Sequence, residues 1–308
     1  MDSISIVTTL RAPLHESMSF VHYHINKGIS HLFLYFDDPD DPAIECLAHY
    51  DNVTCVQCDK HYWTANAGTY PQFIEDRQIF NANHALALAR DRNLDWIIHI
   101  DSDELLYTNT SLEGLLSGVS KDIHVIRFTM REAVPSKLKY RNFFMEVHDF
   151  KVPPTPIQGQ SLASKNVRQA LYHGEYFRGH TGSKSAVRLD SPVKSLHIHF
   201  PIESVENLTV RQSNDIVLLH YDCCDFAAWQ RKCVRRIDGT AAITRTFVRP
   251  NRQLQLKEFT EAYQEGHKKM LELYKRMYFI PKKERATLED LGLLVRIVIN
   301  NRLFDSPG

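Results

Sequence analysis

The residues Trp96-Ile97-Ile98-His99-Ile100-Asp101-Ser102-Asp103-Glu104 are the most informative part of the sequence, because an apolar run leads directly into a cluster of carboxylates. A short apolar run bounded by polar residues is typical of a strand buried on both faces, as in the parallel sheet of an α/β domain. Ligands of such sheets bind beyond the carboxyl ends of the strands. Asp101 and Asp103 lie one residue apart and repel each other unless a cation neutralises them, so the motif favours a divalent metal. A solvated acidic loop is the alternative interpretation.

The composition is that of an ordinary globular protein. Of the 308 residues, 43% are hydrophobic and 24% are charged, and the 37 basic side chains balance the 37 acidic ones. This balance gives no field for nucleic acid, so we expect no nucleic-acid partner. No apolar run is long enough to span a membrane and the first residues do not resemble a signal peptide, so we expect a cytoplasmic protein. The six cysteines are expected to be reduced.

Strand and helix patterns alternate through the first 110 residues. Apolar and β-branched runs predict strands at 3–10, 31–36, 53–57 and 96–100, while helical spacing predicts helices at 13–28 and 73–92 and a short helix ending at 50. Such alternation predicts an α/β fold, a doubly wound and mostly parallel central sheet with helices on both faces. A further strand at 123–128 is expected to extend this sheet.

The second half of the chain has a different pattern. Pro, Gly and polar residues predict long loops at about 130–182, followed by short strands at 185–189 and 195–200. Residues from 225 onward have helical patterns, and the spacing of apolar residues predicts a last helix over 288–298. This helix is expected to pack on the domain, with a membrane-surface or dimer contact as the alternative. The predicted domains are therefore residues 1–224 and a helical extension, 225–308.

Several ordered elements together resemble the GT-A glycosyltransferases. They are Thr8-Thr9, Phe20-Val21-His22-Tyr23-His24 with Gly28, the 31–36 strand followed by Asp37-Asp38, Arg77-Gln78-x-x-Asn81, and Trp-x4-Asp-x-Asp-Glu-Leu. This order is similar to that of the family 2-like and family 92 groups of nucleotide-sugar transferases. The resemblance is clear over residues 3–107, and weaker at 182–188 and at His220-Tyr221. It implies a GT-A-like catalytic domain over 1–224.

The resemblance also implies donor-binding residues. Four positions match those that hold the base and ribose of the donor: Thr8, Thr9, Arg11 and Asp37. Asp37 suits ribose hydroxyls because a carboxylate accepts two hydrogen bonds. Arg77 and Asn81 share one helical face and are expected to reach the nucleotide or the sugar, with a solvated helix surface as the alternative. Lys184 and Arg188 are expected to form a cationic loop for the diphosphate.

A metal site is implied by the same resemblance. Asp101 and Asp103 match the Asp-x-Asp motif, Asp103 as a direct metal ligand and Asp101 as a metal or ribose contact. Related enzymes complete the metal shell with a histidine from the later region, where His220 is favoured over His199. Carboxylate and imidazole ligands together suit Mn2+, with Mg2+ as the alternative.

The implied reaction moves a sugar from a nucleotide-diphosphate sugar, with a UDP-sugar favoured, to a hydroxyl of a glycan or glycoconjugate. Inversion is favoured, and it requires a carboxylate general base on the acceptor. The sequence does not separate three candidates for this base: Glu132, Glu175 and Asp222. Six aromatic residues in predicted loops could stack on the acceptor: Tyr62, Trp63, Tyr70, Tyr172, Tyr176 and Phe177.

Two alternatives from other classes stay open. A phosphoryl- or nucleotidyl-transferring or nucleotide-hydrolysing enzyme would use the same acids, but it normally has a Gly-rich phosphate loop, and none follows the first strand. A non-catalytic carbohydrate-binding scaffold on a transferase fold would be expected to lose the metal-binding acids, whereas Asp101 and Asp103 are both present.

Overall fold

The computed structural model describes residues 2–164, 167, 170–179, 182–201, 208–237 and 250–307. The chain divides into two compact units. The first consists of residues 1–130, 182–218 and 300–308, and the second of residues 131–181 and 219–299. Two strands, β6 (Val125–Ala133) and β9 (Val210–His220), contribute residues to both units. The predicted domains, residues 1–224 and 225–308, stay a prediction.

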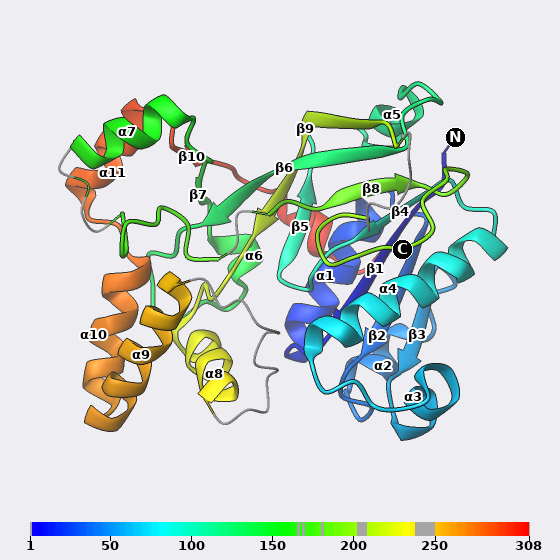
Figure 1. Cartoon of the computed structure of the whole chain (residues 1–308), viewed down its shortest axis with the longest axis horizontal. Coiled ribbons are helices and arrows are strands. Elements are labelled where there is room, and N and C mark those ends of the chain that lie inside the picture. Colours follow the sequence, from blue (N-terminus) through cyan, green and yellow to red (C-terminus); the bar gives the residue numbers. More distant parts are fainter. Residues whose placement is uncertain are drawn as a thin grey trace. The chain divides into compact units, whose positions relative to one another are not determined.

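Four parallel strands form the centre of the first unit. β1 pairs with β2 and with β4, and β2 pairs with β3, all in parallel, while β8 pairs with β4 and with the first residues of β6 in antiparallel fashion. The order β3-β2-β1-β4-β8 can be followed in Figure 1. The mostly parallel α/β sheet is therefore confirmed. The strands of this unit are β1 (Ile4–Leu10), β2 (His31–Phe36), β3 (Val53–Gln57), β4 (Trp96–His99), β5 (Glu104–Tyr107) and β8 (Ser185–Arg188).

The helix α4 (Ile74–Asp91) covers one face of these strands (Figure 1). Its residues Ala82, Ala85 and Leu86 are buried against Val7 and Phe33 in one hydrophobic cluster. The pleat turns the intervening strand residues to the opposite face. The other helices of the unit are α1 (Leu14–Asn26), α2 (Ala43–Leu47), α3 (Lys60–Ala67), α5 (Leu112–Ser117) and the 3-10 helix η1 (Asn301–Phe304).

His24 is fully buried in α1 and is held as a neutral imidazole. Its Nδ1 lies 2.8 Å from the Phe20 carbonyl, which can only accept, so Nδ1 carries the proton. Its Nε2 therefore accepts the backbone N–H of Leu106 at 3.4 Å. Burial lowers the pKa of His24 to about 3, with Lys27 adding to the shift.

We expect this histidine to make stability depend on pH. Its folded pKa lies below its unfolded value, so its contribution is complete above about pH 6.5 and is lost as the pH falls toward the folded pKa. Between about pH 6 and 4 the free energy of unfolding should fall by up to about 1.4 kcal/mol per pH unit from this group. Urea unfolding at several pH values gives the free energy of unfolding as a function of pH. The slope of this dependence should be shallower for His24→Gln than for the parent protein. His15→Gln is the control, because the His15 side chain is 57% exposed; equal slopes for all three proteins would contradict the assignment.

The second unit combines a short antiparallel sheet with a group of helices. The last residues of β6 pair with β7 (Asp149–Lys151), which pairs with β10 (Leu294–Arg296). Trp229, Phe259 and Tyr274 are buried in its hydrophobic cluster. The helices α9 and α10 lie side by side (Figure 1). The helices of this unit are α6 (Phe143–Glu146), α7 (Pro156–Ser164), α8 (Phe226–Ile237), α9 (Pro250–Glu265), α10 (His267–Tyr278) and α11 (Lys282–Asp290).

The predicted strand at 195–200 is wrong. Side chains, rather than a neighbouring strand, bind the backbone of this segment. The Asn83 amide group binds both the N–H and the C=O of Leu196. His99 and Lys184 donate to the carbonyls of His197 and Ile198. An alternating pattern predicts a strand only where a partner edge is available.

Three further predictions need correction. The helix predicted over 288–298 ends at Asp290, because Gly292 adopts a positive φ of 67° and the chain then enters β10. Residues 60–67 form a helix rather than a loop. The predicted loop region at 130–182 contains part of β6 together with α6, β7 and α7; residues 165–166, 168–169 and 180–181 lie outside the described part. Helices do form much of the chain after 225, as expected. In the part of the chain that the structure describes, no helix has the length and apolar character needed to cross a membrane.

Candidate active site

The carboxyl ends of the central strands in the first unit gather most of the residues predicted to bind the donor. The parallel register aligns Leu10 with Phe36 and Val7 with His99. Asp37 follows β2 directly, and Asp101 follows β4 by one residue. In open α/β sheets, ligands bind at this edge.

A buried ion pair joins Asp37 to Arg77. The Arg77 Nε lies 2.7 Å from Asp37 Oδ1, and both side chains are almost fully buried. A second guanidinium nitrogen donates to Asp37 Oδ2 at 3.4 Å, and the remaining one donates to the carbonyls of Pro71 and Gln72. The half-exposed Arg11 lies 3.6 Å from the same carboxylate. Arg77 therefore fixes the orientation of Asp37, and its own donors point into the protein.

A second set of hydrogen bonds joins β1 to α4. The Asn81 amide nitrogen donates to Thr9 Oγ1 at 3.0 Å, and the Asn81 amide oxygen accepts from the Tyr62 hydroxyl at 2.8 Å. Thr8 is fully buried, and the pleat turns it to the opposite face from Thr9. Its hydroxyl has no hydrogen-bond partner among the described residues. The structure therefore connects Thr9 with Asn81 and places Thr8 apart from both.

Asp101 lies in a network of charges at the end of β4. Its Oδ1 accepts from the Gln78 side chain at 2.7 Å, and its Oδ2 lies 3.1 Å from the Lys184 ammonium. The Glu104 carboxylate accepts the Asp101 N–H at 2.8 Å. Burial by itself lowers the pKa of Lys184, but Asp101 and Glu104 outweigh this effect and hold the pKa above its usual value. Lys184 is therefore a buried cation at this edge of the sheet.

Asp103 lies near the carboxyl edge of the sheet, whereas Arg188 lies at the opposite edge. Asp103 is half-buried in the turn between β4 and β5. Arg188 is at the other end of β8, opposite Trp96, with its guanidinium 4.2 Å from the Trp96 ring centroid. It donates to the carbonyls of Val119 and Ile123. The predicted cationic loop of Lys184 and Arg188 is therefore not formed.

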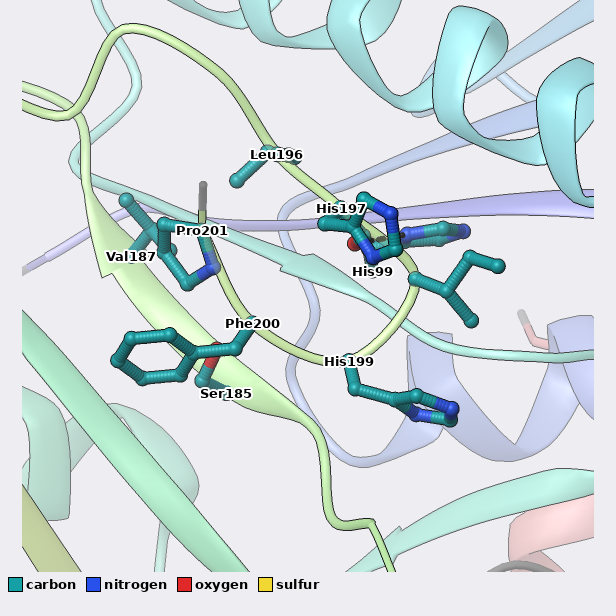
Figure 2. Close-up of a pocket in the computed structure, with 9 residues that line it drawn as sticks. His99, Ser185, Val187, Leu196, His197, His199, Phe200 and Pro201 are labelled. Carbon is teal, nitrogen blue, oxygen red and sulfur yellow. Dashed lines mark hydrogen bonds between the residues drawn. The ribbon is translucent and has the colours of Figure 1, made fainter. Parts of the chain in front are cut away.

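A narrow pocket in the same unit is lined by residues that include His99, Ser185 and His199 (Figure 2). Figure 2 shows the His99 ring bonded to the carbonyl of His197 at 3.1 Å, with His199 farther along the same segment. Burial lowers the pKa of His99 to about 4, and Lys184 adds to the shift. His99 is therefore neutral at pH 7 and donates through Nδ1.

His220 and Asp222 lie together in the second unit, at and just beyond the end of β9. A ring nitrogen of His220 and a carboxylate oxygen of Asp222 are within 4.8 Å of one another, and both residues are buried. Asp222 also pairs with Lys232 of α8. A Cβ atom added at Gly179 would lie 2.9 Å from the His220 ring and 3.4 Å from Asp222. The glycine backbone therefore packs directly on this pair.

The three candidates for the general base differ in their surroundings. Glu132 is 2% exposed, and its carboxylate accepts from Lys151 at 2.9 Å and from the backbone N–H groups of Arg178 and Gly179. Burial by itself raises the pKa of Glu132, but these partners outweigh it and the pKa lies below its usual value. Glu175 is only half-buried and accepts from Asn251 at 2.8 Å.

The aromatic residues predicted to stack on an acceptor are mostly core residues. Tyr62 and Trp63 belong to α3, and five of the six side chains are at most 8% exposed. Tyr70 is the exception at 51% exposed, and its ring lies 5.0 Å from the Arg77 guanidinium.

Several important partners were not identified from the sequence. Gln78 belongs to the Arg-Gln-x-x-Asn pattern, which indicated that this part of the helix lies near the site. The pattern did not predict the hydrogen bond from Gln78 to Asp101. Lys151, Arg178 and Gly179 belong to an arrangement between segments that are distant in sequence. No local pattern marks such an arrangement.

An α/β sheet with ionic and polar side chains at its carboxyl edge is the arrangement by which such proteins bind ligands. The model of glycosyltransferase family 92 matches residues 12–259 of this chain. The chain therefore belongs to glycosyltransferase family 92. The resemblance found in the sequence is thereby confirmed.

Two curated relatives are glycosyltransferase-like proteins of Arabidopsis thaliana. One is 22% identical over 257 residues, which cover 73% of this chain and 54% of the relative. The other is 25% identical over 171 residues, which cover 48% of this chain and 33% of the relative. The chain thus spans about half the length of the first relative and a third of the second.

Solved structures show weaker likenesses. Residues 1–349 of S. aureus TarS match with a TM-score of 0.38 and 12% identity, over 92% of this chain and 82% of that one. Glucosyl-3-phosphoglycerate synthase from Mycobacterium tuberculosis, solved with Mn2+, UDP and glucosyl-3-phosphoglycerate, matches with a TM-score of 0.35 and 14% identity, over 91% and 81%.

Proposed function

We propose that this protein transfers a sugar from a nucleotide-diphosphate sugar, with a UDP-sugar favoured, to a hydroxyl of a glycan or glycoconjugate. The observation that carries the proposal is the set of polar residues at the carboxyl edge of the first unit's sheet. Asp37 with Arg77, Thr9 with Asn81, and Asp101 with Lys184 form three bonded pairs there. Membership of glycosyltransferase family 92 supports the same activity.

On the donor side, Asp37 is proposed to accept hydrogen bonds from the ribose. Arg77 would act by holding the Asp37 carboxylate, because its donors are already bonded within the protein. Arg11 is exposed enough to contact the ligand directly. Lys184 is proposed to face the diphosphate, where a buried ammonium attracts anionic oxygens more strongly than an exposed one. Arg188 is left out, because it packs on Trp96.

A divalent cation is proposed to bind Asp101, Asp103 and His220, with Mn2+ favoured over Mg2+. The donor chemistry fits, since carboxylate oxygen and imidazole nitrogen are both ligands that Mn2+ accepts. Asp103 is proposed as the direct ligand and Asp101 as a metal or ribose contact, as the family resemblance implies. When bound, the cation would stabilise the negative charge of the departing diphosphate.

The reaction breaks the bond between the anomeric carbon and the diphosphate oxygen and forms a bond to the acceptor oxygen. The nucleoside diphosphate leaves with the bonding electrons, and the acceptor hydroxyl gives up its proton. Inversion, which is favoured, needs a carboxylate to take this proton. Asp222 is the preferred candidate because it adjoins His220, and Glu175 is the alternative. Glu132 is unsuitable, since its oxygens are already bonded by an ammonium and two backbone N–H groups.

A thermal-shift panel of nucleotide sugars tests the proposal, each with Mn2+ or with EDTA. A ligand present at 100 times its dissociation constant should stabilise the folded state by about 2.7 kcal/mol, which raises the melting temperature. We expect one donor to give such a rise and EDTA to remove it. Folded protein whose melting temperature responds to no nucleotide sugar, with or without metal, would count against the activity.

A further inference from the structure

The second unit contains a buried set of charges that the proposed reaction does not use directly. Glu132 on β6 lies opposite Lys151 on β7 in the strand register, and the two side chains form an ion pair of 2.9 Å. Both are about 2% exposed. Burying such a pair is costly, and it is tolerated only where further hydrogen bonds satisfy the remaining polar atoms.

The further hydrogen bonds all hold one segment, residues 175–179. Glu132 accepts the N–H of Arg178 at 2.7 Å and the N–H of Gly179 at 2.6 Å. Lys151 donates to the Tyr176 carbonyl at 2.7 Å. The buried Arg178 guanidinium donates to the carbonyls of Glu175 and Met277, and to that of Ala170. The backbone of this segment is therefore fixed from both sides.

Gly179, the last residue of this segment, packs against the His220 ring. An added Cβ atom there would lie 2.9 Å from His220 Cε1 and 3.2 Å from His220 Nδ1, closer than side-chain contacts allow. The imidazole therefore rests on the Gly179 backbone, whose N–H is held by Glu132. A displacement of that N–H moves the surface against which the ring packs.

We propose that Glu132 is a positioning residue, which sets the orientation of the His220 ring by fixing the backbone of Arg178 and Gly179. The inference rests on the proposed function insofar as His220 is taken as a metal ligand. It assigns to Glu132 a role different from that of a general base, and it gives Gly179 a steric reason for being glycine. Residues that orient a metal ligand typically change metal affinity about 10- to 100-fold when they are replaced.

The experiment uses the full chain, labelled with 15N-histidine, in the absence of metal. The ring signals of His220 are assigned by their loss in His220→Gln. Glu132→Gln should shift these signals, because the amide has one accepting oxygen where the carboxylate has two, so its NH2 group must face either the backbone N–H groups or the Lys151 ammonium. Gly179→Ala should shift them as well, because the added methyl group would press directly on the His220 ring. Glu175→Gln is the matched control, since Glu175 lies in the same segment but bonds to Asn251, and it should leave them in place.

Mn2+ titration of the same samples separates this inference from the proposed function. We expect Glu132→Gln and Gly179→Ala to weaken Mn2+ binding about 10- to 100-fold, and Glu175→Gln to leave it within twofold. If the parent protein binds no Mn2+ but Glu132→Gln still shifts the His220 signals, the metal site is wrong and the positioning role stands. Unchanged His220 signals in folded Glu132→Gln would overturn the positioning role. If Glu132→Gln does not fold, unchanged signals in Gly179→Ala would overturn it.

Discussion

Asp103→Asn is expected to lower the rate of sugar transfer about 100-fold or more, with the fold intact. The substitution removes the negative charge that we propose binds the cation, while it keeps the size of the side chain. Several kcal/mol of stabilisation of the leaving diphosphate would be lost, and each 1.4 kcal/mol corresponds to a tenfold change in rate. The fold should tolerate the change because Asp103 is half-buried in a turn. The measurement is the release of nucleoside diphosphate from the donor found in the thermal-shift panel.

Asp91→Asn is the matched control, because Asp91 is an exposed aspartate at the end of α4. It should keep the parent rate. Asp101→Asn would be a poorer test, since it would leave the buried Lys184 without its closest carboxylate. A rate for Asp103→Asn within threefold of the parent would remove Asp103 from the mechanism.

Lys151→Met is expected to lower the free energy of unfolding by about 3–5 kcal/mol. The methionine fills the space of the lysine stem but leaves the Glu132 carboxylate buried without its ammonium partner. Both side chains are 3% exposed, so water cannot replace the lost interaction. Burial and the neighbouring Arg178 lower the pKa of Lys151 to about 8, but Glu132 opposes the shift, so the group is still largely charged at pH 7. Urea unfolding followed by circular dichroism measures the change.

Lys137→Met is the control for this effect. Lys137 forms a 3.0 Å ion pair with Glu146, close in length to the Lys151 pair, but the Lys137 side chain is 60% exposed. Exposed pairs contribute about 0–1 kcal/mol, so the variant should unfold nearly as the parent does. Similar losses in the two variants would show that burial does not decide the strength of the Lys151 pair.

The parallel sheet was predictable because its signals are local. The β1, β2, β3 and β4 strands carry runs of apolar and β-branched residues, and the structure has them within one residue of the predicted bounds. The failures occurred where long-range contacts override local patterns. Leu294 and Val295 fit helical spacing, but they pair with Lys151 and Phe150 in the sheet. The alternation at 195–200 fits a strand, but side chains bind its backbone instead.

The candidate site was predicted in part for the same reason. Residues just beyond strand ends share an edge by topology alone, so Asp37 and Asp101 could be placed from the sequence. Whether a side chain is free to bind depends on its partners, and the sequence did not show that Arg77 is already bonded to Asp37. Arg188 shows the same limit, because it lies four positions after Lys184 at the far end of β8, where it is opposite the first residue of β4.

Sugar transfer by this protein can be followed on the donor sugar itself. A nucleotide sugar labelled with 13C at the anomeric carbon is incubated with the protein and a panel of glycan acceptors, with Mn2+ or with EDTA, and the products are observed by NMR. We expect Mn2+-dependent release of nucleoside diphosphate and a new glycosidic signal of inverted anomeric configuration. A new signal of retained configuration would contradict the proposed base. Intact donor in every reaction with folded protein would contradict the claim that this chain is a sugar transferase.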